Sequence, residues 1–368
     1  MQLFDVRTAR ILVTISAFIA AGAFLYGIRH AIVLFLFAIF FAYLLAPLVG
    51  RVQHSCLARG SRALAIAETY VCLGLVFGGL TIVFGPRLAR DTRRLAESLP
   101  YLLENVATGN IAWQLGSRHG WSHDTQVRIQ HFIAAHQQEL LNWAAQAGRR
   151  IAEFLANALW LIVIPILAIF FLREGERFAE AAVHALERGK QRRLLRDILG
   201  ELDRMLSRFI FTQLMLGGFS LVAYGLVLTL LHFPYSLVLA LAGGIMEFIP
   251  VVGPLVAAVV IFGVGLLTAF PHLWVVALFL AGWRVSLDYF ISPRVMGGGL
   301  EMHPLMVIAA VLIGAELGGI IGVYLAIPIA ATIRILGSSW KAYSAADEVG
   351  KTRLTEVVTP PPPRRAIR

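Results

Sequence analysis

Residues 237–270 read LVLALAGGIMEFIPVVGPLVAAVVIFGVGLLTAF, an almost wholly apolar stretch in which Glu247 is the one charged side chain. A charge at the centre of a bilayer is costly, so we expect Glu247 to face protein or a water-filled cavity and not lipid. Pro250, Gly253 and Pro254 follow closely and remove or weaken helical hydrogen bonds. Broken backbone at this depth is tolerated only where protein or a cavity satisfies it. The stretch therefore predicts a polar pocket inside a membrane protein.

The composition indicates an all-α polytopic membrane protein. Hydrophobic residues make up 58% of the 368 residues and charged residues 15%. Several apolar stretches exceed the roughly 20 residues that cross a bilayer as a helix. The net charge of +10 does not predict nucleic-acid binding, because the basic residues lie mainly in short segments between apolar runs. Cys56 and Cys72 indicate neither a disulfide framework nor a metal site.

The apolar runs predict about eight transmembrane segments. Residues 11–28 and 31–49 are separated by only two residues and are predicted to form a tight hairpin, and residues 63–84 a third span that ends at Gly85 and Pro86. Later single spans are expected at residues 151–172, 209–231 and 273–291. The expected divisions are 1–86, three transmembrane helices; 87–150, an extracytoplasmic or interfacial amphipathic helical segment; 151–208, a fourth transmembrane helix and a cytoplasmic basic helix; 209–337, a C-terminal transmembrane core; and 338–368, a disordered cytoplasmic tail.

Two apolar stretches are too long for single spans. Residues 236–270 and 304–336 are about 35 and 33 residues long, and both carry Gly and Pro near their centres. We therefore predict two broken helical hairpins, which would enter the membrane from opposite faces as in many secondary transporters. Glycine enrichment of packed membrane helices is the simpler alternative to an inverted repeat. The predicted helix breaks or hinges are Pro250, Gly253, Pro254, Pro293, Gly297, Pro304, Gly318, Gly319, Gly322 and Pro328.

The distribution of basic residues predicts the orientation. With the N-terminus inside, most Lys and Arg residues between spans fall on the cytoplasmic side. We expect both termini to lie in the cytoplasm.

Four charged residues are the candidates for a transport pathway: Glu247, Arg284, Asp288 and Glu316. Each has a structural alternative. Glu247 could be a protonated carboxyl or the partner of Arg284, and Asp288 lies four residues after Arg284, where the two would neutralise each other. Glu316 lies at the expected tip of the second hairpin, where it would meet outside water or line a gate.

An enzyme is not predicted. No H-E-x-x-H motif or paired nucleophile and base occurs in the sequence, so we expect no catalytic residue, metal or cofactor. Four histidines of the 87–150 segment do not share one helical face and are expected on the surface; they are His119, His123, His131 and His136.

Short motifs across the chain carry a resemblance to a known family. They are FFLREG at 170–175, FIPVVGP at 248–254, DYFISPRVMG at 288–297, LEMHPL at 300–305, GAELGGIIG at 314–322 and AIP at 326–328. In order and spacing they resemble the AI-2E family of transporters, which includes autoinducer-2 exporters and the PerM-like permeases. The resemblance implies a bacterial inner-membrane protein with about eight spans that forms oligomers. Many relatives carry Asn where this chain has Tyr289, so a role of the asparagine amide in binding cargo cannot be assigned to this chain.

Three functions remain open from the sequence. The leading one is ion-coupled secondary transport of a small polar solute, such as the autoinducer-2 signal that the family resemblance implies. The second is sodium/proton antiport, which the family resemblance also implies. The acidic residues suit a cation, whereas Arg284 suits an anionic or polyol group, so the composition does not choose between the two. The third is a scaffold or regulatory partner that docks through residues 87–150 and the basic helix near Arg192. The expected partners are membrane lipids, a small polar solute or Na⁺/H⁺, and further copies of the chain.

Overall fold

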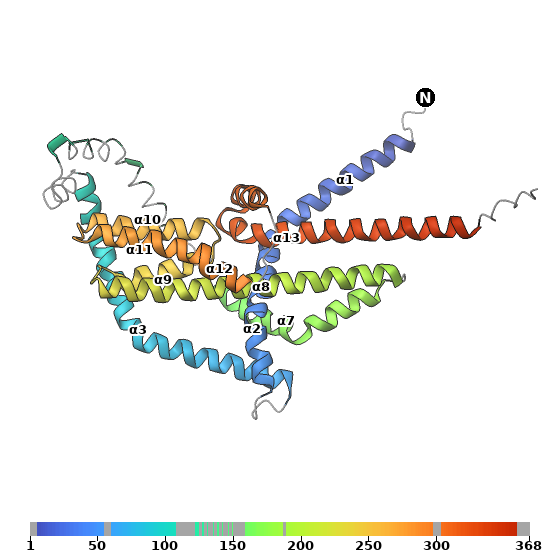
Figure 1. Cartoon of the computed structure of the whole chain (residues 1–368), viewed down its shortest axis with the longest axis horizontal. Coiled ribbons are helices and arrows are strands. Elements are labelled where there is room, and N and C mark those ends of the chain that lie inside the picture. Colours follow the sequence, from blue (N-terminus) through green and yellow to red (C-terminus); the bar gives the residue numbers. More distant parts are fainter. Residues whose placement is uncertain are drawn as a thin grey trace, which may run out of the picture. The chain divides into compact units, whose positions relative to one another are not determined.

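The computed structural model describes residues 6–54, 60–107, 159–186, 189–296 and 303–358, with scattered residues between 122 and 149. Its regular elements are helices (Figure 1), so the all-α prediction is confirmed. Five of the described helices are long and apolar enough to cross a membrane, and three further apolar helices are shorter. The elements are α1 (Val6–Gly27), α2 (Arg29–Gln53), α3 (Arg62–Ala107), α7 (Leu159–His184), α8 (Gly189–Leu230), α9 (Ser236–Met246), α10 (Val252–Leu267), α11 (Leu273–Ser286), the π-helix η1 (Leu287–Ile291), α12 (Ser292–Met296) and α13 (Pro304–Val358).

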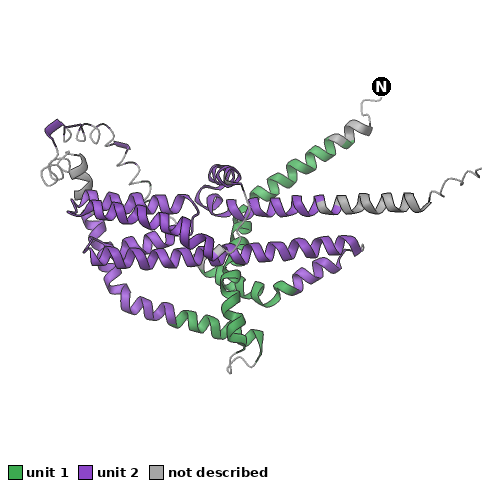
Figure 2. Cartoon of the chain, viewed as in Figure 1, with its two compact units in different colours: residues 1–75, 144–176 green, residues 76–143, 177–368 purple. Residues whose placement is uncertain are grey.

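The chain forms two compact units (Figure 2). Unit 1 consists of residues 1–75 and 144–176, and unit 2 of residues 76–143 and 177–368. In unit 1, the Tyr70 hydroxyl donates a hydrogen bond of 2.8 Å to the Pro165 carbonyl and so links α3 to α7. The buried core of unit 1 comprises Ala42, Leu45, Val49, Ala65, Ile66, Ala168 and Leu172. Unit 2 holds all the candidate site residues.

The predicted hairpin between the first two spans is wrong. Only Ile28 separates α1 from α2, and the hydrogen bonds Ile28 N to Phe24 O and Ile32 N to Ile28 O, both 3.0 Å, continue the helical pattern across it. Arg29 stays within reach of Tyr26, with its guanidinium carbon 3.9 Å from the ring centre. Unlike proline, Arg29 and His30 each keep a backbone N–H donor, so the helical hydrogen bonds can continue through them. The chain therefore bends here without reversing (Figure 1). The prediction of two cytoplasmic termini counted a membrane crossing by each of these helices, and it stays a prediction.

The third span also continues past its predicted end. α3 runs through Gly85 and Pro86 to Ala107, because a proline removes one helical hydrogen bond and can bend a helix without ending it. The part of α3 beyond Pro86 has one half-buried face at helical spacing, as expected for an amphipathic segment. That face consists of Leu88, Asp91, Leu95 and Ser98. Residues 108–121 and many of the positions up to 158 lie outside the described residues.

Helices α8 and α9 pack closely because glycines on α9 admit side chains of α8. A Cβ atom added to Gly243 would lie 2.7 Å from the Tyr224 ring, and one added to Gly244 would lie 2.7 Å from Leu221 Cβ. Both contacts are closer than real Cβ atoms tolerate. The core that these helices share with α10 and α11 comprises Tyr224, Leu228, Phe233, Leu239, Ala240, Ile261, Phe270, Val276 and Leu280.

Two similar turns join α8 to α9 and α10 to α11. Each turn has a residue with positive φ, His232 at 52° and Ala269 at 48°, followed by a Phe-Pro pair. The amides of Phe233 and Phe270 close the turns with hydrogen bonds of 2.8 and 2.9 Å to carbonyls five residues earlier. This is the Schellman arrangement of a helix C-terminus. The two Phe rings pack with centroids 4.8 Å apart, so the turns lie side by side at one end of the four helices.

Replacing His232 with Gly should stabilise the protein. His232 is exposed, and its left-handed backbone costs a residue with a Cβ roughly 1–2 kcal/mol. Glycine avoids this cost, but its greater conformational freedom in the unfolded chain increases the entropy lost on folding. We therefore expect a net gain of about 0.5–1 kcal/mol in the free energy of unfolding. Thermal unfolding in detergent measures it. His232→Ala is the control, since it removes the imidazole and keeps the Cβ; an equal gain in both variants would exclude the backbone explanation.

The second long stretch is a helical hairpin within α13. The chain reverses at Gly319, whose φ of 58° and ψ of −138° are not helical. A Cβ on Gly314 would lie 2.4 Å from the Gly322 carbonyl oxygen, and one on Gly322 would lie 1.9 Å from that of Gly314. The backbones of the two arms are therefore in contact, and the prediction of two broken hairpins is confirmed.

The second arm of α13 continues far beyond the membrane-length stretch. It passes Pro328 and ends at Val358. Residues 338–358, which we predicted to be part of a disordered tail, are helical in the structure. Their low hydrophobicity argues against a packed core, but alanine, lysine, glutamate and arginine are good helix formers. Residues 359–368 lie outside the described residues.

Candidate functional site

The first hairpin breaks at residues 247–251, between α9 and α10. The amides of Phe248 and Ile249 bond to carbonyls three residues back, at 3.1 and 2.9 Å, so the helix tightens as it ends. The amide of Val252 then bonds to the Pro250 carbonyl at 2.7 Å, across Val251 with φ 67° and ψ −54°. This is a γ-turn, which is strained, and positive φ is rare for a β-branched residue. The hairpin tip thus holds backbone strain next to Glu247.

Gly253 makes the tight tip sterically feasible. Its amide donates a hydrogen bond of 2.9 Å to the Ile249 carbonyl. A Cβ at this position would lie 1.7 Å from the Met246 carbonyl oxygen, so only glycine fits. The predicted break at Pro250, Gly253 and Pro254 coincides with this tip.

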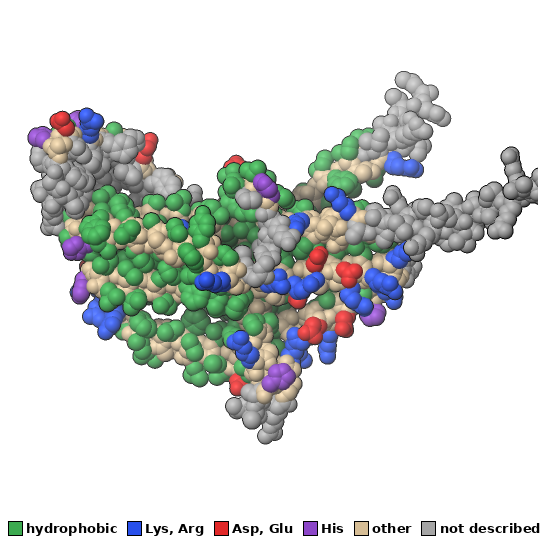
Figure 3. All heavy atoms as spheres, viewed as in Figure 1, with side chains coloured by type: hydrophobic (Ala, Val, Ile, Leu, Met, Phe, Trp, Pro, Cys, Tyr) green, Lys and Arg blue, Asp and Glu red, His purple; other side chains and the backbone are tan. Residues whose placement is uncertain are grey.

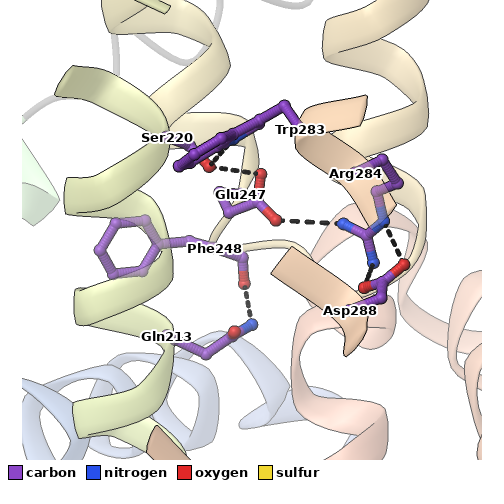
Figure 4. Close-up of polar contacts among 7 residues, drawn as sticks. All are labelled: Gln213, Ser220, Glu247, Phe248, Trp283, Arg284 and Asp288. Atoms are coloured by element: carbon purple, nitrogen blue, oxygen red, sulfur yellow. Dashed lines mark hydrogen bonds and ion pairs between the residues drawn. The ribbon is translucent and has the colours of Figure 1, made fainter. Parts of the chain in front are cut away.

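The carboxylate of Glu247 is buried and paired (Figure 4). The residue is 4% exposed, and its Oε1 accepts a hydrogen bond of 3.2 Å from Arg284 Nη1 on α11. Its Oε2 accepts one of 3.2 Å from the Ser220 hydroxyl on α8, and Ser220 Oγ in turn accepts one of 3.1 Å from Trp283 Nε1. Both oxygens therefore have donors, which is the usual condition for a buried charge. Three helices meet at this side chain.

Arg284 links the buried carboxylate to a second one that is half exposed. Its Nε lies 2.7 Å from Asp288 Oδ2 and its Nη2 lies 2.5 Å from Asp288 Oδ1, a bidentate pair. The side chains of Arg284 and Asp288 are 41% and 44% exposed, against 3% for that of Glu247. Asp288 lies in η1, and π-helical turns occur frequently at functional sites. The guanidinium therefore connects the protein interior with a more accessible surface.

A further polar side chain of α8, Gln213, contacts the hairpin tip. Gln213 Nε2 donates a hydrogen bond of 3.1 Å to the Phe248 carbonyl, which the broken helix leaves without an internal donor. The Phe248 ring packs on Gly217, where an added Cβ would lie 2.8 Å away. Thr212 Oγ1 is buried without a hydrogen-bond partner among the described residues. Gln213, Ser220 and Trp283 were not predicted from the sequence. The signal was present for two of them, because Gln213 and Ser220 are seven residues apart and share a helical face of an apolar span.

The two hairpins touch at the tip of the first. Ile249 packs against a buried cluster on both arms of the second hairpin, made of Val311, Val323 and Ala326. Ile249 lies two residues after Glu247, so a displacement of the second hairpin would act on the backbone that carries the buried carboxylate.

The remaining predicted residues lie at other places. Glu316 is exposed near the reversal at Gly318 and Gly319, and the described residues show no hydrogen bond or ion pair between it and the Glu247 cluster. Tyr289 is 75% exposed. Pro304 is the first residue of α13, a position whose backbone N–H would have no partner within the helix, so the missing N–H of proline costs no hydrogen bond there. Pro293 lies in α12, and Gly297 falls outside the described residues.

The arrangement holds two carboxylates and one guanidinium. With all three ionised, the cluster of Glu247, Arg284 and Asp288 carries a net charge of −1. Such a cluster can take up a proton or another cation. The hydroxyl of Ser220 and the indole of Trp283 already donate within the site, to Glu247 and to Ser220.

Comparisons with known proteins agree on one family. A family model described as AI-2E family transporter matches residues 12–341. The chain is 26% identical over 308 residues to "Putative transport protein YrrI" of Bacillus subtilis, covering 81% of this chain and 83% of that protein. It is 29% identical over 175 residues to "Putative transport protein YueF" of the same organism, covering 47% of each. It is 27% identical over 199 residues to "Putative permease PerM" of Escherichia coli, covering 53% of this chain and 55% of that protein.

Proposed function

Since this chain belongs to the AI-2E transporter family, we propose that it moves a small polar solute across the bacterial inner membrane and couples this movement to an ion. It is a multi-pass membrane protein of a transport family and not an enzyme. The observation that carries the proposal is the burial of Glu247 at the tip of a broken hairpin.

The position of this carboxylate supports a transport pathway. Ionisable residues inside membrane segments are rare, and they mark substrate or ion pathways. Broken helices near the midplane serve the same purpose in secondary transporters, where their free backbone groups bind substrate or ions. Here the break, the buried carboxylate and the bridging Arg284 occur within one polar cluster.

The contact between the hairpins supports a mechanism of alternating access. Ile249 connects the tip of the first hairpin to both arms of the second. We propose that movement of the second hairpin shifts this tip and separates Glu247 from Arg284, which would expose the carboxylate to a cation or to the solute. A cation that neutralises the exposed Glu247 carboxylate would then favour the return step, because an uncharged carboxyl can be buried without Arg284 as its partner.

Sodium/proton antiport is the second candidate. The observation that favours it is the excess of one carboxylate over the guanidinium in the cluster, which suits a cation without any organic solute. Both candidates use Glu247, so they differ in cargo and not in site.

The charge distribution along α8 supports an orientation. Its N-terminal half, from Gly189 to Arg208, presents charged side chains, whereas α9, α10 and α11 present mainly hydrophobic ones (Figure 3). The positive-inside rule places this half of α8 in the cytoplasm. The turns at His232 and Ala269 would then face the opposite side.

Flux through the purified protein in proteoliposomes tests the proposal. Sodium, proton and autoinducer-2 gradients are imposed separately, and the movement of each species is followed. We expect solute flux that depends on one ion gradient. Sodium movement against protons without solute would instead establish antiport. No flux under any gradient, together with a stable co-purifying protein, would contradict both and favour a scaffold.

A further inference from the structure

A polar cavity lies at the end of unit 2 that holds the α8–α9 turn. Its volume is about 630 Å³. One wall comes from α3 and the other from the turn, and the lining residues are Asp91, Arg94, Glu97, Ser98, Pro234 and Tyr235. Ser220 of the transport cluster is 15 residues before Tyr235, and 10 residues of α8 beyond Ser220 span about 15 Å of helix. The cavity is therefore a separate site.

The two walls are held together by a hydrogen bond. The hydroxyls of Ser98 and Tyr235 are 2.7 Å apart, although the residues are 137 positions apart in the sequence. Tyr235 has a positive φ of 56° at the start of α9, which is unusual for an aromatic residue. The position of its ring is thus fixed by both the turn and α3.

The cavity offers one free charge of each sign. Glu97 is paired with Arg93 at 2.8 Å, with both side chains exposed. Asp91 and Arg94 have no ion pair or hydrogen bond within the described part of the chain. The lining is therefore close to neutral overall but dipolar. It matches a ligand with a cationic and an anionic group, such as an ammonium joined to a phosphate.

Exposed apolar side chains lie on both elements that form the cavity. On α3, Ile82 is 78% and Val83 64% exposed, and they precede Asp91 by about two helical turns. On α8, Leu226 is 60% and Leu230 68% exposed just before the turn. In a membrane protein such surfaces contact acyl chains. A phospholipid has both parts, a polar headgroup for the cavity and acyl chains for the apolar side chains of α3 and α8.

We propose that this cavity binds the zwitterionic headgroup of a phosphatidylethanolamine lipid. The ammonium lies at Asp91, and the phosphate accepts hydrogen bonds from Arg94 and from the Tyr235 hydroxyl, whose oxygen accepts the hydrogen of Ser98. Free phosphoethanolamine shares this chemistry, but it lacks the chains that would cover the apolar surface. A bound lipid would brace α3 against the α8–α9 turn, opposite the end where the hairpins meet.

Native mass spectrometry of the full-length protein in mixed micelles tests the proposal. The probes are phosphatidylethanolamine, phosphatidylglycerol, which has no ammonium, and soluble phosphoethanolamine. We expect Asp91→Asn to weaken phosphatidylethanolamine binding about tenfold, as for one charge-assisted hydrogen bond, without weakening phosphatidylglycerol binding. Arg94→Gln should weaken both lipids to a similar extent.

Arg204→Gln on the charged half of α8 is the matched control and should leave both lipids bound as in the wild type. The three substituted side chains are exposed or half-buried, so circular dichroism should report unchanged helix content. Equal loss of both lipids in Asp91→Asn, or no loss in either cavity variant, would overturn the proposal. Binding of phosphoethanolamine as tight as that of the lipid would overturn it in favour of a soluble ligand.

Discussion

Glu247→Gln is expected to abolish ion-coupled flux while the protein still folds. Glutamine has the same shape and can accept the Ser220 hydrogen bond, but it cannot carry the negative charge that pairs with Arg284. A hydrogen bond to a charged group is worth roughly 1.5–3 kcal/mol, so we expect a fall in flux on the order of 100-fold. The measurement is initial flux in proteoliposomes at equal protein density.

The folding of this variant follows from the same geometry. Replacing the carboxylate removes a buried charge, and Arg284 keeps its bidentate partner Asp288. The change in the free energy of unfolding should therefore stay within about 1–2 kcal/mol, as gel filtration and thermal unfolding can check.

Asp288→Asn is the graded comparison for Glu247→Gln. Asp288 is half exposed and contacts the same guanidinium, so its loss should reduce flux by much less. Wild-type flux in a folded Glu247→Gln protein would exclude a role for this carboxylate in coupling. Equal losses in the two variants would indicate that the pairing of Arg284, and not the buried charge, limits transport.

Gly253→Ala should cause the largest loss of stability among the glycine substitutions of the first hairpin. The added Cβ would lie 1.7 Å from the Met246 carbonyl oxygen and 2.7 Å from its carbon, and both are backbone atoms that no rotamer change can move. The tip must open, which breaks the γ-turn and displaces Glu247. We expect a cost of about 3 kcal/mol or more in unfolding free energy, and loss of flux.

Gly263→Ala is the matched control for Gly253→Ala. It lies on the same helix, α10, and no atom lies within 4 Å of the added Cβ. Alanine is the better helix former by roughly 0.5–1 kcal/mol, so this variant should be as stable as the wild type or more stable. Thermal unfolding of both variants in detergent decides the question. Similar midpoints for the two would contradict the close approach at the tip.

The sequence located both hairpins but misjudged three helix ends. Length and glycine content identified the reversals near Pro250 and Gly319, because a stretch much longer than a bilayer has to turn back. The same local signals failed at Ile28 and Pro86, where the chain only bends, and in the helical tail after residue 338. A proline or a pair of polar residues indicates only that a helix is weakened at that position. Whether the helix ends there depends on the residues that pack beside it.

The sequence alone determined that Glu247 needs a protein partner, because the cost of a charge among apolar neighbours follows from the local sequence. It also suggested Arg284 and the pairing with Asp288, since residues four apart share a helical face. Only the tertiary structure decided that Ser220 and Trp283 complete the site, and that Glu316 lies apart from it. Ser220 is 27 residues before Glu247 and reaches it only because glycines let α8 and α9 approach closely. Distances between helices depend on such packing along their whole length, and no local pattern of residues encodes them.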